Sequence, residues 1–276
     1  MKIIISHDVD HLYSADHLFR DLVVPKLIAR SILQILGLYG DRIAIRECLL
    51  RCVMPFRREM NNIQKLAAFD KIHGVPSTFF FGMANCLGMS YHRKKALPYI
   101  KKLWSMGFHC GVHGCEYKNA AGIKAEREGF RDLTDRDPDG IRLHYVRFDN
   151  GTFEKLAEAG YLFDSTEFDK VSGTCIKAPY RVGDMWEFPC CVMDTYLPYE
   201  FEKARMMTLD ALEQAEIGKI AYFTVLFHDF YFGPEYSVYY QWYLWFVEHL
   251  RQCGYEIISF KDAIEQLNDS FSEVSM

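Results

Sequence analysis

The first strand-like segment of this sequence ends in two carboxylates. Asp8 and Asp10 follow an apolar run of isoleucines at 3–5 and are separated by one residue. An apolar, β-branched run of this length predicts a buried strand, in which alternate side chains point to the same face. Two carboxylates side by side repel each other unless a cation or a shared proton lies between them. The pattern therefore indicates a metal site or a catalytic pair, against the alternative that the two residues cap a helix or bind an arginine.

Further polar residues fall where later strands are expected to end. Carboxylates, imidazoles and guanidiniums at separate strand ends can meet at the mouth of one barrel. A single histidine is more often a hydrogen-bonded structural residue, so the set matters more than any one member. Its members, in chain order, are His11, His113, Glu116, Tyr117, Arg142, His144, Arg147, Asp164, Arg181, His228 and Asp229.

The spacing of His109 and His113 raises the question of a metal pair. On a helix, residues four apart share a face. On a strand they lie about 13 Å apart, which is too far for one ion. The neighbouring Gly111 and Val112 favour a strand. We therefore reject the pair and keep His113, which lies at the end of the expected strand.

Strand-like and helix-like segments alternate along the chain. This order predicts a parallel sheet with helical crossovers, and about seven such units suggest a barrel near the (β/α)8 type. Beyond the first strand, we expect strands at 76–82, 108–113, 140–148, 161–163, 186–193, 220–227 and 255–260. We expect helices at 57–73, 94–106, 120–133, 152–159 and 238–253, one that ends over 209–216, and a short one from Lys261.

The segment 13–56 is longer than a strand-to-helix connection needs. Its apolar residues recur at helical spacing, and glycines at 37 and 40 interrupt it, so we expect two helices. They are more apolar than a solvated surface requires, and covering the barrel is favoured over contact with a partner. We expect one domain over residues 1–276, with 13–56 as a helical insertion and 268–276 as a polar tail.

The bulk composition excludes some classes of function. The 276 residues carry a net charge of -5, so no basic excess indicates nucleic acid or an anionic membrane. We expect no signal peptide and no transmembrane segment, because charged residues interrupt every apolar run. The nine cysteines form no CxxC pair. With no signal peptide, they predict reduced thiols and a cytoplasmic location.

In order, these segments resemble the motifs of the polysaccharide deacetylases, carbohydrate esterase family 4. The first motif is an apolar strand with two aspartates, here 3–10, and the second begins Gly-x-His, here 111–113. The third carries an arginine before a loop, as in 147–151, and the last is Leu-x-His, here 226–228. Segments 180–183 and 187–194 also resemble a branch found in cell-surface polysaccharide gene clusters. The resemblance spans about 3–267.

The resemblance implies a distorted (β/α)7 barrel and metal-assisted removal of an acyl group, N-acetyl above all, from a sugar or polysaccharide precursor. Asp8 would be the general base, and Arg147 would orient it. Asp10 and His113 would bind a divalent metal, with Zn as the first choice. His228 would be the general acid. A sugar nucleotide or a lipid-linked sugar would be a fitting substrate, and nucleic acid would not. The oligomeric state stays open.

The sequence departs from the family pattern at Tyr117, where the family has a second metal-binding histidine. His11, Glu116 or water could complete the metal shell, or no metal binds, as in a metal-independent C–N hydrolase of the same fold. Arg142 or Arg181 could take the place of Arg147. The remaining candidates for the site are His144 and Asp164, and Asp229 or Asp164 is expected to hydrogen-bond His228.

A second interpretation is a barrel without catalysis that binds a glycan or a protein partner. Tyr117 and the apolar segment 13–56 favour it. The combination of Asp8, Asp10, His113 and His228 favours the enzyme.

Overall fold

The computed structural model of this protein describes residues 1–17 and 22–274, with side chains as far as residue 269. Its strands are β1 (Lys2–Val9), β2 (Thr78–Gly82), β3 (His109–Gly114), β4 (Ile141–Leu143), β5 (Phe163–Asp164), β6 (Tyr180–Val182), β7 (Met185–Glu187), β8 (Cys190–Met193), β9 (Tyr222–Leu226) and β10 (Glu256–Ile258). The helices are α1 (Val23–Ile35), α2 (Ile45–Val53), α3 (Ile63–His73), α4 (Leu97–Met106), α5 (Ala120–Thr134), α6 (Thr152–Glu158), α7 (Phe201–Ile217), α8 (Ser237–Gln252) and α9 (Phe260–Val274).

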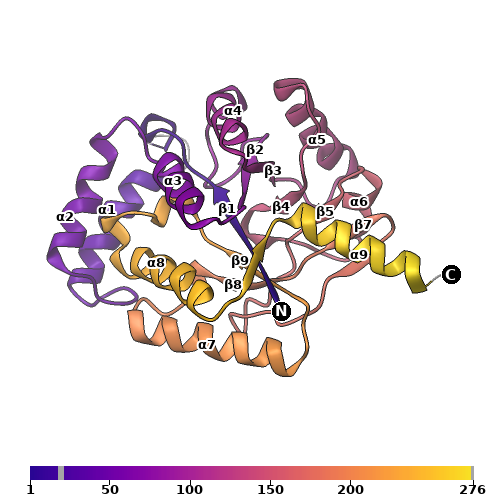
Figure 1. Cartoon of the computed structure of the whole chain (residues 1–276). Coiled ribbons are helices and arrows are strands. Elements are labelled where there is room, and N and C mark those ends of the chain that lie inside the picture. The colour runs from indigo at the N-terminus through magenta and orange to yellow at the C-terminus, as the bar shows by residue number, and fades with distance from the viewer. Residues whose placement is uncertain (18–21, 275–276) are drawn as a thin grey trace.

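The strands form one curled sheet. Its order is β6-β7-β5-β4-β3-β2-β1-β9-β8, and β10 pairs with β1. The pairings are parallel except for that of β6 with β7. The helices lie around the outside of this sheet (Figure 1). The predicted distorted barrel, with a helical insertion after the first strand, is confirmed.

The alternation of side chains along β1 explains where the carboxylates lie. Ile3 and Ile5 pack outward in the large cluster under the helices, whereas Ile4 points to the other face and packs with Phe80. Asp8 continues the inward row of Ile4 and is buried. Both faces of β1 are therefore covered, as is usual for parallel sheets, and its sequence is a continuous apolar run until the polar end.

Some element boundaries differ from those predicted. The strand expected over 140–148 is only β4, because Tyr145 and Val146 have positive φ angles of 59° and 44°. The segment 186–193 forms two strands, β7 and β8, instead of one, and β6 was not predicted. Residues 268–274, expected as a polar tail, continue α9, and 275–276 lie outside the described residues.

The two helices expected within 13–56 are α1 and α2, which pack against each other. Residues 18–21 of this segment lie outside the described part of the chain. An apolar cluster that contains Val24, Met54 and Phe230 joins the insertion to the loops at the end of β9. Among the described residues, no helix is long and apolar enough to cross a membrane.

The prediction of reduced thiols is wrong for two of the nine cysteines. Cys86 and Cys115 form a disulfide, and the other seven cysteines are free. The two are 29 residues apart in the sequence, and the fold brings them together. The bond joins the loop after β2 to the end of β3.

Phe80 connects the core to the polar interior, because it is fully buried and its ring lies 4.8 Å from the Cζ atom of Arg142. We expect Phe80→Ala to lower the free energy of unfolding by about 3–5 kcal/mol, through the cavity that it leaves. Urea denaturation would measure this. Phe148→Ala is the control, since Phe148 is exposed. Equal losses from both substitutions would contradict the role given to Phe80.

Candidate metal centre and active site

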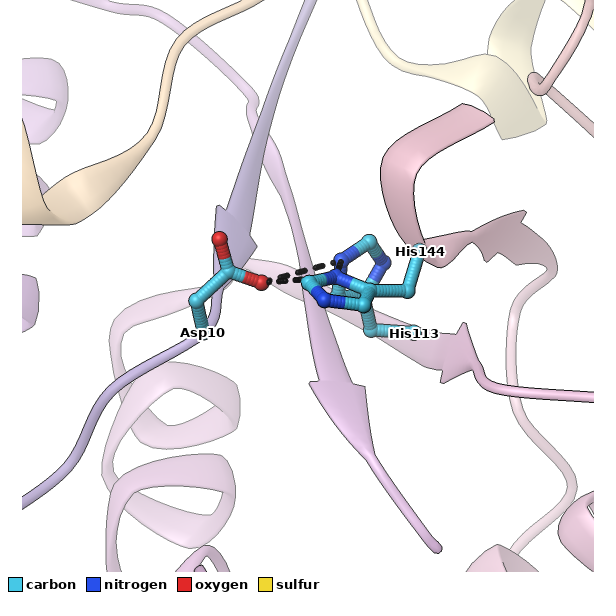
Figure 2. Close-up of side chains that lie close together, drawn as sticks. All are labelled: Asp10, His113 and His144. Carbon is cyan, nitrogen blue, oxygen red and sulfur yellow. Dashed lines mark hydrogen bonds and ion pairs between the residues drawn. The ribbon is translucent and has the colours of Figure 1, made fainter. Parts of the chain in front are cut away.

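Asp10, His113 and His144 converge at the carboxyl ends of β1, β3 and β4 (Figure 2). Asp10 Oδ1 lies 3.2 Å from His113 Nε2 and 3.1 Å from His144 Nδ1. The two imidazole nitrogens are 3.0 Å apart. This donor cluster combines two nitrogens and one oxygen, the donor types that zinc takes in proteins.

Backbone carbonyls fix which nitrogen of each imidazole faces the donor cluster. His113 Nδ1 lies 3.0 Å from the carbonyl oxygen of Arg142, and His144 Nε2 lies 2.9 Å from that of Leu87. A carbonyl only accepts, so these two ring nitrogens carry the hydrogens and donate them. His113 Nε2 and His144 Nδ1 are then left with lone pairs that point toward Asp10. Metal-binding histidines are usually oriented in this way.

The charge balance at the donor cluster also fits a cation. Asp10 Oδ1 is buried and accepts no ordinary hydrogen bond. Burial alone would raise the pKa of Asp10, but His144 and His113 beside it hold that pKa well below its usual range. Burial likewise opposes protonation of His113, yet Asp8 and Asp10 raise its pKa. Both shifts indicate a place that favours positive charge, so the residues present fit a divalent metal.

Asp8 lies beside the donor cluster and is held by Arg142. One Asp8 oxygen accepts a hydrogen bond of 3.1 Å from Arg142 Nη1, and the other lies 3.7 Å from His113 Nε2. Arg142 is fully buried and also donates to the carbonyl and hydroxyl oxygens of Ser165. A guanidinium fixed by several acceptors can hold a carboxylate in one orientation.

His228 is positioned by a carboxylate that the sequence reasoning missed. Asp194 accepts 2.8 Å from His228 Nδ1 and 2.6 Å from the backbone amide of the same residue. His228 Nε2 is therefore turned toward Asp10, whose Oδ2 lies 3.8 Å away. Burial lowers the pKa of His228, but the charge and hydrogen bond of Asp194 outweigh it and raise that pKa to about 10.

Asp194 directly follows β8, at the same edge of the sheet as the other polar strand ends. The only sequence signal for it was a strand end, because the strand-like run 186–193 stops there. The expected partners of His228 were Asp229 and Asp164. Instead, the Asp229 carboxylate accepts a hydrogen bond from the backbone N–H of Asn62.

The other candidates have different surroundings. Arg147 stacks on Tyr145 rather than binding Asp8, and Arg181 pairs with Asp184. Glu116 accepts the backbone N–H groups of residues 117–119 and is no part of the donor cluster. Tyr117, likewise outside the donor cluster, is half-buried with the Lys118 ammonium over its ring. The structure thus brings His144, rather than His11, Glu116 or Tyr117, to the third position.

A left-handed turn explains how His144 reaches the donor cluster. β4 ends at Leu143, and the positive φ angles of Tyr145 and Val146 turn the chain away directly afterwards. Non-glycine residues adopt such angles at a cost of about 1–3 kcal/mol each, and these conformations gather at functional sites. The disulfide also helps to hold His144, because Cys86 directly precedes Leu87, and the carbonyl oxygen of Leu87 accepts a hydrogen bond from His144 Nε2.

A cleft opens on both sides of the donor cluster. One cavity, of about 360 Å³, is lined by Asp10, His11 and His144 together with residues of α1. The second, of about 440 Å³, extends toward the end of β8, where it is lined by Met193 and Tyr196. Residues shared by both cavities are Asp10, His144, Tyr145, His228 and Tyr231.

The chain matches no protein-family model and no curated protein. Among solved structures, a protein named as a polysaccharide deacetylase from Mycobacterium smegmatis has a TM-score of 0.63 at 15% identity, over 98% of this chain and 90% of that chain. A polysaccharide deacetylase from Bacillus cereus has a TM-score of 0.46 at 13% identity, over 94% and 91% of the two chains. A carbohydrate esterase family 4 pseudoenzyme from Bacillus anthracis has 0.47 at 10%, over 95% and 65%. The first similarity shows that this chain has the polysaccharide deacetylase fold; the other two are too weak to compare further.

If His144 is the third metal donor, its loss should be as damaging as that of His113. We expect His144→Ala to weaken zinc binding by more than about 100-fold, because changes even in outer-shell partners of metal ligands cost about 10–100-fold. Isothermal titration calorimetry would measure this. Tyr117→Phe is the matched control and should bind as the unaltered protein does. Full affinity in His144→Ala would contradict the assignment.

Asp164 and Glu187 lie side by side on the paired strands β5 and β7, are buried and are not members of the donor cluster. One oxygen of each has no hydrogen-bond partner. Burial raises the pKa of both carboxyl groups, so the pair retains a proton that the unfolded chain releases. The resulting stabilisation is complete below the unfolded pKa of about 4 and is lost as the pH rises through the folded value.

We therefore expect Glu187→Gln, whose amide can donate to Asp164, to be more stable than the unaltered protein at pH 8. The gain should exceed about 1 kcal/mol, and it should shrink toward pH 5. Chemical denaturation at both pH values would measure it, with Asp184→Asn on the surface as control. A constant difference between the two pH values would rule out the retained proton.

Proposed function

We propose that this protein is a metal-dependent deacetylase that removes an acyl group, N-acetyl above all, from a sugar. The observation that carries the proposal is the close grouping of a general base, a metal-type donor cluster and a general acid. Asp8 lies 3.7 Å from His113 Nε2, and His228 Nε2 lies 3.8 Å from Asp10 Oδ2. Each of these two residues has its own buried partner, Arg142 or Asp194.

Hydrolysis of the amide needs a base near the attacking water. A divalent ion held by Asp10, His113 and His144 would polarise the acyl carbonyl and make water acidic. Asp8 accepts the proton of the water while the hydroxyl oxygen bonds to the acyl carbon. Arg142 keeps the Asp8 carboxylate turned toward the donor cluster.

The leaving amine needs an acid. His228 donates its Nε2 proton to the nitrogen as the bond from carbon to nitrogen breaks, which gives acetate and a free amine. Asp194 supports this role in two ways: it binds Nδ1 and so fixes the ring orientation, and it raises the pKa of His228 to about 10 so that the ring is protonated at neutral pH. A cation held by Asp10 would oppose that charge and would lower the pKa of His228 toward the range useful for proton transfer.

The cleft suits a sugar. Tyr145 and Tyr231 line both cavities, and Tyr196 lines the second. Aromatic rings beside polar groups are common where a ligand has both an apolar face and hydroxyl groups. The alternative of a barrel without catalysis was based on Tyr117 and on the apolar segment 13–56. His144 would supply the metal donor that Tyr117 lacks.

The proposal is tested first by product formation. We expect the zinc-loaded protein to release acetate from N-acetylated sugars and to leave a free amine at the same position. Asp8→Asn should abolish the release while zinc still binds. No acetate from any N- or O-acetylated glycan, with metal bound and the fold intact, would contradict the proposal.

The role of His228 has its own test. We expect His228→Ala to lower kcat by about 10²–10⁴-fold, the usual contribution of one acid–base side chain. Steady-state kinetics would measure this, with calorimetry to check that zinc affinity is retained. Asp194→Asn should lose part of the rate and shift the pH profile. His92→Ala, an exposed histidine, is the control. A kcat close to that of the unaltered protein in His228→Ala would exclude it as the acid.

A further inference from the structure

The polarity of α2 is reversed relative to an ordinary surface helix. Its buried face carries an ion pair, Glu47 with Arg51, at i, i+4. Arg51 also donates to the carbonyl oxygen of Glu235 and to the hydroxyl of Tyr199. These bonds fix α2 on the rest of the protein through polar contacts, whereas a surface helix usually buries its apolar side.

The outward face of α2 is apolar. Ile45, Leu49 and Val53 follow one another at intervals of four residues and are 68%, 62% and 52% exposed. Phe56, just beyond the helix, is 86% exposed. Residues at this spacing form one stripe on a helix. Figure 1 shows α2 at the outer edge of the molecule. The exposed fractions of the three side chains show that none of the described elements covers this stripe.

Exposed apolar residues are concentrated in this part of the chain. Of the nineteen large apolar side chains that are exposed in the described residues, ten lie within 22–56. Scattered single residues of this kind are ordinary, but a dense group usually marks a surface that binds something. The ten are Leu22, Ile32, Leu33, Leu36, Leu38, Tyr39, Ile45, Leu49, Val53 and Phe56.

The same segment is basic in an acidic protein. Residues 22–58 hold seven Lys or Arg and two Asp or Glu, whereas the whole chain has a net charge of -5. Of the two acids, Glu47 is buried against Arg51, which leaves Asp41 as the exposed one. The exposed cations are Lys26, Arg30, Arg42, Arg46, Arg57 and Arg58.

We propose that residues 22–58, here called the insertion surface, bind the face of an anionic lipid membrane. Exposed apolar side chains with basic residues among them are the pattern of helices that lie in a membrane interface. Anionic head groups attract the arginines, and the apolar stripe of α2 enters the boundary between head groups and acyl chains.

A second copy of the chain fits this surface less well. Across a two-fold axis the same patch faces itself, so the cations around the stripe would meet other cations. An anionic bilayer offers opposite charge and apolar cover together.

The insertion surface continues into the cleft. Lys26, Leu27 and Arg30 of α1 line the same cavity as Asp10 and His228. A membrane bound at the insertion surface would therefore lie near the cleft opening. This placement favours a substrate whose sugar is joined to a lipid through phosphate, with Lys26 and Arg30 beside the anion. That substrate class rests on the proposed deacetylase activity, but membrane binding does not.

Vesicle co-sedimentation tests membrane binding without any use of activity. The full chain is mixed with phosphatidylcholine vesicles that either contain or lack phosphatidylglycerol. We expect binding to the anionic vesicles that weakens as salt is raised. Two variants, here called the α2 variants, separate the contributions. Leu49→Ser with Val53→Ser removes two of the three stripe residues, and Arg42→Glu with Arg46→Glu reverses the charge in α2 and just before it. Each should weaken binding by about tenfold or more, because one basic residue at such a surface contributes about fivefold and each apolar side chain lost from the boundary contributes at least as much.

Matched controls carry the same changes elsewhere. Met206→Ser with Ile217→Ser alters exposed apolar residues of α7, and Lys101→Glu with Lys102→Glu alters exposed cations of α4. These should bind vesicles as the unaltered protein does. Circular dichroism checks the fold of every variant. No binding to anionic vesicles, or equal losses in the α2 and control variants, would overturn the proposal. So would a dimer in light scattering that the α2 changes abolish while vesicles do not bind.

The two proposals fail separately. Vesicle binding without acetate release would leave the membrane surface standing and remove the deacetylase. Acetate release without vesicle binding would do the reverse. The α2 variants should keep their activity on a water-soluble N-acetyl sugar, because none of their altered residues belongs to the site.

Discussion

Three acceptor atoms point at one another in the middle of the cleft, and the positions of most other site residues depend on this cluster. His113 Nε2, His144 Nδ1 and Asp10 Oδ1 lie 3.0–3.2 Å apart. Lone pairs at such distances repel unless a positive charge lies among them. Two backbone carbonyls hold the imidazoles in this state by taking their other hydrogens. The protein thus maintains an arrangement that only a proton or a cation makes favourable.

The rest of the site depends on two pairs of polar residues, one at the end of β1 and one at the end of β4, with the same spacing in the sequence. Asp8 lies near the end of β1 and Asp10 directly follows the strand, whereas β4 contains Arg142 and is followed by His144, again two residues apart. Asp8 meets Arg142, and Asp10 meets His144. β2 and β3 separate these strands in the sheet, so the contacts cross the curled interior. This geometry supports one carboxylate as a base and the other as a metal ligand, although they differ by only two positions.

The sequence was sufficient for the parts of this arrangement that depend on local pattern. The apolar run and the alternation of β1 predicted that Asp8 and Asp10 share a face, and the alternation of strands and helices predicted the barrel. The predicted ends of two helices, at residues 73 and 106, are also correct, and each is followed by a glycine, Gly74 or Gly107, with a left-handed φ angle.

The parts that depend on tertiary contacts were less predictable. Arg142 rather than Arg147 reaches Asp8 because β4 stops early, and the left-handed Tyr145 has no clear signature in the sequence. Only the fold brings Asp194 to His228, and only the fold brings Cys86 to Cys115. The exposed apolar face of α2 could not be predicted from periodicity alone, because the pattern does not say which side of a helix faces outward.

The most direct test of the central claim is the ligand set of the bound metal. X-ray absorption at the zinc edge, on protein loaded with zinc, distinguishes imidazole nitrogen from other light ligands through its ring scattering. The account predicts two imidazoles and at least one oxygen in the first shell, with one imidazole lost in His144→Ala. A shell with a single imidazole, unchanged by that substitution, would contradict it.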